Sequence, residues 1–157
     1  MSDTRQRTIQ GLKAGDSFTV VRTFTEQDML KFSEITRDFN PVHFDQRFSE
    51  EKKFKDRICH GLLVASMLTE IGGQIGWLAS VMNFRFIKPV YFGDTIECSM
   101  RIVEIDEHQR ARAQVIYRNQ ECSIVLEAEL AGILPGIRER QILNQMLTEG
   151  DPTNKVA

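Results

Sequence analysis

The feature that most constrains this chain is an apolar run from Gly61 to Gly76. A helix over this run carries apolar side chains on nearly every side, namely Leu62, Leu63, Val64, Ala65, Met67, Leu68, Ile71 and Ile75. Such a helix is normally buried inside a protein. Because Thr69 and Glu70 interrupt the run, it is too short to span a membrane. We therefore expect one buried central helix that the rest of the chain must cover.

Beyond this run the chain changes to the alternating pattern of a sheet. From Ser80 onward, apolar and polar residues alternate in four consecutive segments, at 82–87, 96–102, 111–118 and 122–130. One-sided alternation over consecutive hairpins is typical of an antiparallel meander with one buried face. The sequence therefore predicts a four-strand meander that packs against the central helix.

The residues before the central run predict a strand, a helix and an irregular lid. The strand is expected over 16–23, and Thr25 is predicted to cap a helix that ends near Thr36. Two short helical pieces are expected in the charged stretch 45–57. The whole order is an α+β pattern. A single sheet wrapped around one central helix satisfies both kinds of burial.

The length of 157 residues suits a single domain. We place this domain at residues 1–134 and predict that residues 1–12 are poorly ordered, because they are polar. Pro135 and Gly136 end the last strand, and apolar residues farther on predict a short helix in a C-terminal tail, 135–157.

The charge and cysteine patterns exclude several classes of protein. With a net charge of -2 and no basic block, a nucleic-acid partner is not expected. The first residues lack the apolar core of a signal peptide, so we expect a cytoplasmic protein with no membrane partner. Cys59, Cys98 and Cys122 form no C-x-x-C pair. We therefore expect reduced thiols, no metal site and no cofactor.

Two short segments carry the candidate chemistry. In the first, Asp38 and His43 lie on either side of an Asn40-Pro41 turn, which bends the chain so that their side chains can converge. In the second, a buried helix begins at Gly61 and presents unpaired N–H groups. Such donors stabilise negative charge on a carbonyl oxygen. A carboxylate, an imidazole and an N–H donor are the parts needed to move water across a double bond conjugated to a thioester. The alternative is a purely structural turn with a hydrogen-bonded core histidine.

These segments resemble a known family. Residues 32–43 (FSEITRDFNPVH) are similar to the signature of the MaoC-like dehydratases, the (R)-specific enoyl-CoA hydratases, and residues 59–66 (CHGLLVAS) to their helix-opening segment. Residues 84–94 (FRFIKPVYFGD) resemble the family's second strand and the turn after it. The resemblance covers roughly 16–132. It implies the hotdog fold, a curved antiparallel sheet around a central helix, in a homodimer or higher homo-oligomer with a composite site.

The resemblance also implies roles for single residues. Asp38 and His43 become the catalytic pair that holds and activates water, and the Gly61 N–H becomes the donor to the thioester carbonyl. The expected supporting residues are Asn40, Ser66 and Thr69. The expected acyl-pocket residues, with core packing as the alternative, are Phe39, Val42, Phe44, Leu62 and Leu63. The expected reaction is reversible hydration of an enoyl thioester in fatty acid metabolism, with CoA or acyl carrier protein as the carrier.

One position departs from the family pattern, and two other functions stay open. Arg37 replaces a small residue, often glycine; we interpret it as a solvated charge at a helix end, with pairing to Asp38 or a CoA phosphate as alternatives. His60 is interpreted as structural, capping or positioning the turn. The first alternative function is a hotdog acyl-CoA thioesterase that uses Glu70. The second is a non-catalytic module that binds acyl thioesters.

Overall fold

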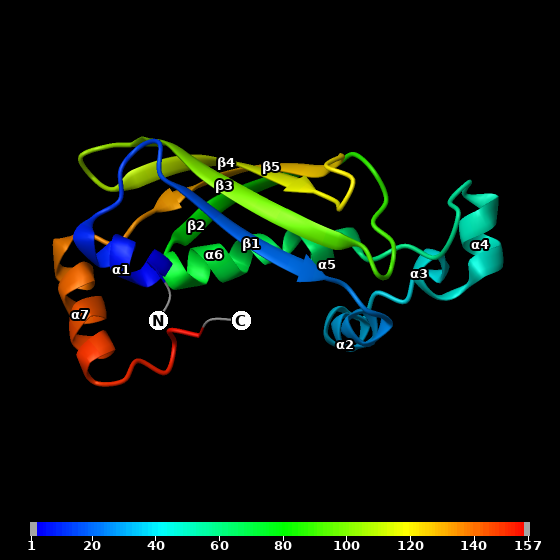
Figure 1. Cartoon of the computed structure of the whole chain (residues 1–157), viewed down its shortest axis with the longest axis horizontal. Helices are drawn as coiled ribbons and strands as arrows, with labels where there is room; N and C mark the ends of the chain where they lie inside the picture. The colour runs from blue at the N-terminus through cyan, green and yellow to red at the C-terminus, as the bar shows by residue number, and fades with distance from the viewer. Residues whose placement is uncertain (1–2, 156–157) are drawn as a thin grey trace.

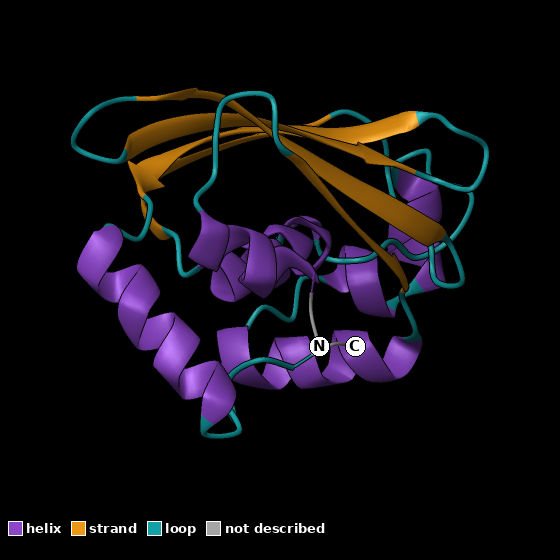
Figure 2. Ribbon diagram, turned by 60° about the vertical axis from the view of Figure 1, so that its left-hand side comes forward, coloured by secondary structure: helices purple, strands orange, loops and turns teal. Residues whose placement is uncertain are grey.

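The chain folds as a curved antiparallel sheet over a layer of helices (Figures 1 and 2). The structure is a computed structural model that describes residues 3–155. Its helices and strands follow one another as α1 Asp3–Gln10, β1 Ser17–Thr23, α2 Glu26–Thr36, α3 Pro41–Phe44, α4 Gln46–Glu51, α5 Gly61–Ala65, α6 Met67–Ile75, β2 Leu78–Phe86, β3 Thr95–Ile105, β4 Arg110–Arg118, β5 Ile124–Ile133 and α7 Ile137–Thr148. The α+β prediction is confirmed.

The predicted central helix is present as α5 and α6, which lie under the sheet. Its buried residues join the inward side chains of the strands in one core; they include Val64, Met67, Leu68, Ile71 and Ile75. The one difference from the prediction is a break at Ser66.

Hydrogen bonds explain why the central helix breaks at Ser66. The Ser66 hydroxyl donates to the Leu63 carbonyl, and both the N–H and the hydroxyl of Thr69 donate to the Ser66 carbonyl. Thr69 therefore leaves the Ala65 carbonyl free. The buried hydroxyl of Tyr117 in β4 donates to that carbonyl at 2.9 Å. The sheet thus satisfies the group that the break exposes.

The strand order is β1-β3-β4-β5-β2, which corrects one part of the predicted topology. β3, β4 and β5 do form consecutive antiparallel hairpins. The predicted four-strand meander is wrong for β2, because this strand pairs with β5 at the far edge and not with β3. Alternation of period two tells which face of a strand is buried, but it does not identify the neighbouring strand.

The remaining helices form two groups at opposite ends of the central helix. In Figure 1, α2, α3 and α4 lie beyond the start of α5, whereas α1 and α7 lie beyond the end of α6. The predicted helix after Thr25 is confirmed, including its cap: Thr25 and Asp28 form a reciprocal capping box. The predicted tail helix is confirmed as α7.

The N-terminal segment corrects a second prediction. Residues 1–2 lie outside the described residues, but residues 3–10 form α1 and are not poorly ordered. The reason is Arg5, which is buried, donates to the Gln74 carbonyl at 2.7 Å and pairs with Asp151 at 2.8 Å. Within residues 3–155, no helix combines the length and the apolar character needed to cross a membrane.

Candidate active site

The turn after α2 fixes the carboxylate of Asp38. Arg37 ends the helix in a left-handed conformation, with φ 62°. One carboxylate oxygen of Asp38, Oδ1, then accepts the Asn40 N–H at 3.1 Å. The amide oxygen of Asn40 in turn accepts the Val42 N–H and caps α3, which begins at Pro41. The predicted turn therefore forms, and it leaves the second oxygen of Asp38, Oδ2, free to face the site.

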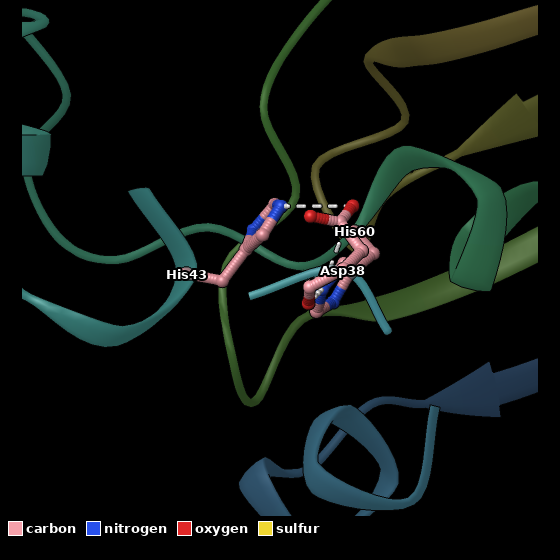
Figure 3. Close-up of side chains that lie close together, drawn as sticks. All are labelled: Asp38, His43 and His60. Carbon is pink, nitrogen blue, oxygen red and sulfur yellow. Dashed lines mark hydrogen bonds and ion pairs between the residues drawn. The ribbon is translucent and has the colours of Figure 1, made fainter. Parts of the chain in front are cut away.

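His43 is held by its other ring nitrogen. Its Nδ1 lies 2.7 Å from the Ile58 carbonyl, and because a carbonyl only accepts, Nδ1 carries the hydrogen. The neutral ring then presents a lone pair at Nε2, which lies 4.0 Å from Oδ2 of Asp38 (Figure 3). Burial lowers the pKa of His43 below its ordinary value, against the hydrogen bond to Ile58 and the charge of Asp38. His43 is therefore a neutral base near pH 7.

His60 joins this pair, which the sequence reasoning did not predict. Its ring stacks on His43 with centroids 3.7 Å apart, and its Nε2 lies 3.0 Å from the backbone carbonyl of Asp38 (Figure 3). The side chain makes no capping hydrogen bond to α5, but it does bond a backbone carbonyl in the turn after α2, so of the two structural roles interpreted from the sequence the contact fits positioning of the turn. The sequence signal that could have revealed this role is slight: a histidine directly before the glycine that opens a buried helix.

Asp38, His43 and His60 also lie close enough together to be considered as metal ligands, since their donor atoms lie within 4.8 Å of one another. The ring geometry argues against an ion. Two imidazoles stacked at 3.7 Å and 28° direct their lone pairs side by side and not at a common point. The Nε2 of His60 is also occupied by its hydrogen bond to Asp38. The cluster fits a metal poorly, and the absence of a metal stays a prediction.

Gly61 opens α5 directly beside this cluster. His60, the residue before it, supplies no side-chain cap, and the first N–H groups of α5 have no acceptor within the helix. A Cβ at Gly61 would lie 2.6 Å from the Phe86 ring. The sequence therefore needs glycine here because a ring from β2 covers the helix start.

A cavity of about 450 Å³ lies against these groups, a size typical of small-molecule sites. Asp38, His43, His60 and Gly61 form its polar part. Its apolar wall comes mainly from segments distant in sequence, namely Phe54, Ile58, Cys59, Leu62, Val64, Phe86, Ile87, Pro89, Val90, Val125 and Leu126. Lys88 contributes the one cationic side chain of the wall among the described residues.

The structure brings only part of the predicted acyl pocket to this cavity. Leu62 lines it, whereas Phe39, Val42, Phe44 and Leu63 do not. Val42 is buried and Leu63 packs against the core. Phe39 is 57% exposed and contacts Phe44. A role for these four in binding the acyl chain stays a prediction.

Several other candidates lie away from the cavity. The hydroxyl groups of Ser66 and Thr69 bond to backbone carbonyls of their own helix, so their supporting role stays a prediction. Glu70, the candidate of the thioesterase alternative, pairs with Arg22 and does not line the cavity. Within the part of the chain that the structure describes, the exposed Arg37 forms no ion pair, which favours the solvated-charge interpretation.

The chain is similar to several known proteins. A family model described as MaoC like domain matches residues 11–123. Over 135 residues the chain is 29% identical to the mitochondrial 3-hydroxyacyl-acyl-carrier-protein dehydratase of Arabidopsis thaliana, covering 80% of each chain. It is 31% identical over 110 residues to the 3-hydroxybutyryl-CoA dehydratase of Methylorubrum extorquens, covering 66% of this chain and 69% of that one.

Solved structures give the same result. The (R)-hydratase from A. caviae involved in PHA biosynthesis matches with a TM-score of 0.75 and 25% identity, over 80% of this chain and 99% of that one. The predicted hotdog fold is thereby confirmed.

Proposed function

The chain belongs to the MaoC-like dehydratase family, and on that premise we propose that it adds water reversibly across the 2,3 double bond of an enoyl thioester. The product is a (3R)-hydroxyacyl thioester, and the reverse reaction is its dehydration. Relatives named hydratase and dehydratase support a hydro-lyase. The observation that carries the proposal is the facing pair of Asp38 Oδ2 and His43 Nε2, 4.0 Å apart at the cavity wall.

This separation suits one shared water molecule. A gap of 4.0 Å is too long for a direct hydrogen bond, but a water about 2.8 Å from each atom bridges it. Asp38 and the neutral His43 both accept hydrogen bonds, so each can orient a hydrogen of that water. As the water oxygen adds to C3, the pair takes its proton and delivers one proton to C2. Because the two groups are coupled, they share the acid and base roles.

The N–H of Gly61 supplies the third part. When water adds at C3, negative charge develops on the thioester oxygen. An N–H at the start of α5, with the positive end of the helix behind it, stabilises that charge. The apolar wall of the cavity then accommodates the acyl chain and keeps bulk water away.

We further propose that the chain acts as a homodimer or higher homo-oligomer. β2 pairs with β5 on one side only, and among the described residues no strand lies along its outer edge. Large apolar residues on this strand are exposed, namely Leu78, Val81, Met82 and Phe86. Such an edge is suited to pair with a second copy. Since Phe86 also lines the cavity, a second copy at this edge would help to close the site.

The carrier is CoA or acyl carrier protein, and the proposed location is the cytoplasm.

The test follows the loss of the enoyl-thioester absorbance of crotonyl-CoA, with the product checked by an (R)-specific dehydrogenase. We expect Asp38→Asn and His43→Ala each to lower kcat about 10²–10⁴-fold. The controls are Asp3→Asn and His108→Ala, whose side chains are exposed and far from the site. The proposal fails if the folded native chain hydrates no short, long or branched enoyl-CoA and no enoyl acyl carrier protein. It also fails if both site variants keep full activity.

A further inference from the structure

We propose that His60 is a positioning residue that aligns Asp38, His43 and Gly61 for the reaction. This inference rests on the proposed function, since it explains how the hydration site is held together. His60 is 1% exposed and lies 22 residues from Asp38 in the sequence, yet it contacts both members of the catalytic pair. Its own Nε2 lies 3.8 Å from Oδ2 of Asp38.

The first contact fixes the main chain at Asp38. The backbone carbonyl of Asp38 accepts hydrogen bonds but cannot donate them, so the Nε2 of His60, at 3.0 Å, carries the hydrogen. The hydroxyl of Ser33 lies 3.4 Å from the same nitrogen and donates its own hydrogen to Met29. It therefore also faces His60 as an acceptor. Two acceptors from the α2 region thus bind one N–H.

The second contact sets the plane of His43. The hydrogen bond from Nδ1 of His43 to Ile58 fixes one atom of that ring, but the ring can still rotate about this bond. The flat face of His60, stacked at 3.7 Å, limits this rotation. The ring centroids of Phe32 and Phe44 lie 5.2 Å and 6.4 Å from that of His60, with Phe44 edge-on. These two rings therefore restrict the movement of the His60 ring.

The third link is covalent. His60 directly precedes Gly61, so a shift of His60 moves the N–H proposed to bind the thioester oxygen. The donor at Nε2 and the flat face of the His60 ring thus each have a use at the site.

A matched pair of variants isolates the donor. His60→Gln and His60→Met have side chains of similar length, and both lack the ring, but only glutamine offers an N–H to the Asp38 carbonyl. We expect His60→Met to lower kcat on the order of 10²-fold, with KM changed far less, because small misplacements of reacting groups have effects of this size. We expect His60→Gln to recover most of that loss. His108→Gln and His108→Met are the controls, since His108 lies in an exposed turn.

An unspecific structural role predicts a different result. Both variants would then lower Tm while the folded fraction kept its kcat, or both would lose activity equally. Either result overturns the proposal, as does a loss confined to KM. If His60→Met does not fold, His60→Phe is compared with the native chain instead, because it keeps a ring but lacks the donor; we expect it to lower kcat as well, and a native kcat would overturn the proposal.

A measurement without substrate separates this proposal from the proposed function. The carbonyl carbon of Asp38 reports its hydrogen bond by NMR, so its chemical shift should move in His60→Met and return toward the native value in His60→Gln. If the shift responds but the native chain hydrates no enoyl thioester, the contact stands and the proposed function fails. If the native chain is active and the Asp38 shift does not respond, the positioning role fails.

Discussion

The two ends of the central helix differ in whether their backbone groups have hydrogen-bond partners. We call the start of α5 the open end and the end of α6 the closed end. Beyond the end of α6, side chains and turns bind the exposed carbonyl groups. At the start of α5 the N–H groups stay uncapped and face a cavity. Both ends of a helix leave backbone groups without partners. A fold normally satisfies them, so an end left open beside a buried acid/base cluster indicates function.

The C-terminal end shows how complete this pairing can be. Gly76 ends α6 in a left-handed turn, with φ 77°, and its N–H bonds back to the helix. Arg5 donates to the carbonyls of Gln74 and Gly73 and pairs with Asp151. The amide of Gln74 reaches the backbone of Lys155 at 2.8 Å. This end therefore joins both termini of the described chain to the central helix and has a structural role.

The largest effect expected from this contrast comes from removing the Gly61 N–H, the first of the uncapped N–H groups at the start of α5. A Cβ at Gly61 meets Phe86, so the comparison is made in a Phe86→Ala background. There, Gly61→Ala keeps the N–H, and Gly61→Pro removes it at a first helical position that tolerates proline. We expect Gly61→Pro to have a kcat about 10²–10³-fold below that of Gly61→Ala, the usual effect of losing one oxyanion donor.

Hydration of crotonyl-CoA measures this difference, and circular dichroism checks that both variants are folded. Equal kcat values in the two variants would show that the Gly61 N–H does not contribute to the reaction, although it is uncapped.

The next effect disrupts the closed end. Arg5→Met keeps most of the side-chain length but leaves Asp151 and two helix carbonyls without their cation. We expect Tm to fall by several degrees while kcat at a temperature well below Tm stays native, because the site lies at the other end of the helix. Thermal unfolding and crotonyl-CoA assays of the same sample measure both. The control is Arg7→Met, whose side chain is partly exposed. If Arg5→Met kept the native Tm, the contacts of Arg5 would not stabilise this end of the helix. If it lowered kcat without lowering Tm, this end would affect catalysis, which contradicts its purely structural role.

The same contrast explains what the sequence could predict. Helix α2 was predicted because Thr25 is a favourable cap and the carboxylates of Glu26 and Asp28 follow it in the first turn, so neighbouring residues determine this start. Helix α1 was missed because Arg5 finds its partners at Gln74 and Asp151, far along the chain. Local polarity contains no information about partners at that distance.

The candidate site divides in the same way. Asp38, Asn40 and His43 were found because one short turn brings them together. The stacking of His60 on His43 depends on how two separate segments pack, so no spacing along the chain could reveal it. The cavity wall was mostly missed because residues such as Phe86 and Val125 reach it from the sheet. The position of β2, which no alternation pattern encodes, places Phe86 there.

The two ends should also respond to acid at different pH values. The pKa of His43 is lowered, chiefly by burial, so its neutral form persists below pH 6.5. In that range the unfolded chain binds a proton before the folded one, so stability begins to fall as pH drops below 6.5. The pKa of Asp151 is lowered from 3.8, first by its hydrogen bond to Thr153. Its stabilisation is present above pH 3.8 and is lost as pH falls through its lower folded value.

We therefore expect kcat/KM to decline with a midpoint below pH 6.5, roughly tenfold per pH unit, before the closed end weakens. Profiles of kcat/KM and Tm over the same pH series measure the two responses. An acid midpoint at or above pH 6.5 would refute a neutral, buried His43, and His108→Ala should leave the midpoint unchanged.

The smallest expected effect lies at Arg37, beside the open end. Its left-handed φ of 62° is strained for a residue with a Cβ, and glycine relieves this strain at some entropic cost. We expect Arg37→Gly to raise the free energy of unfolding by about 1 kcal/mol or less. Urea unfolding measures this change. Because Arg37 forms no ion pair with Asp38 among the described residues, kcat should stay native.

Lys53→Gly is the matched control, since Lys53 is also exposed with a φ of 67°. If both variants gain stability and keep the native KM for crotonyl-CoA, Arg37 is a solvated charge at a strained helix end. If only Arg37→Gly raises KM, the guanidinium reaches the phosphates of the carrier. Arg37 would then belong to the substrate-binding site together with Asp38 and His43. A loss of stability in Arg37→Gly would show instead that the arginine side chain holds the turn before Asp38.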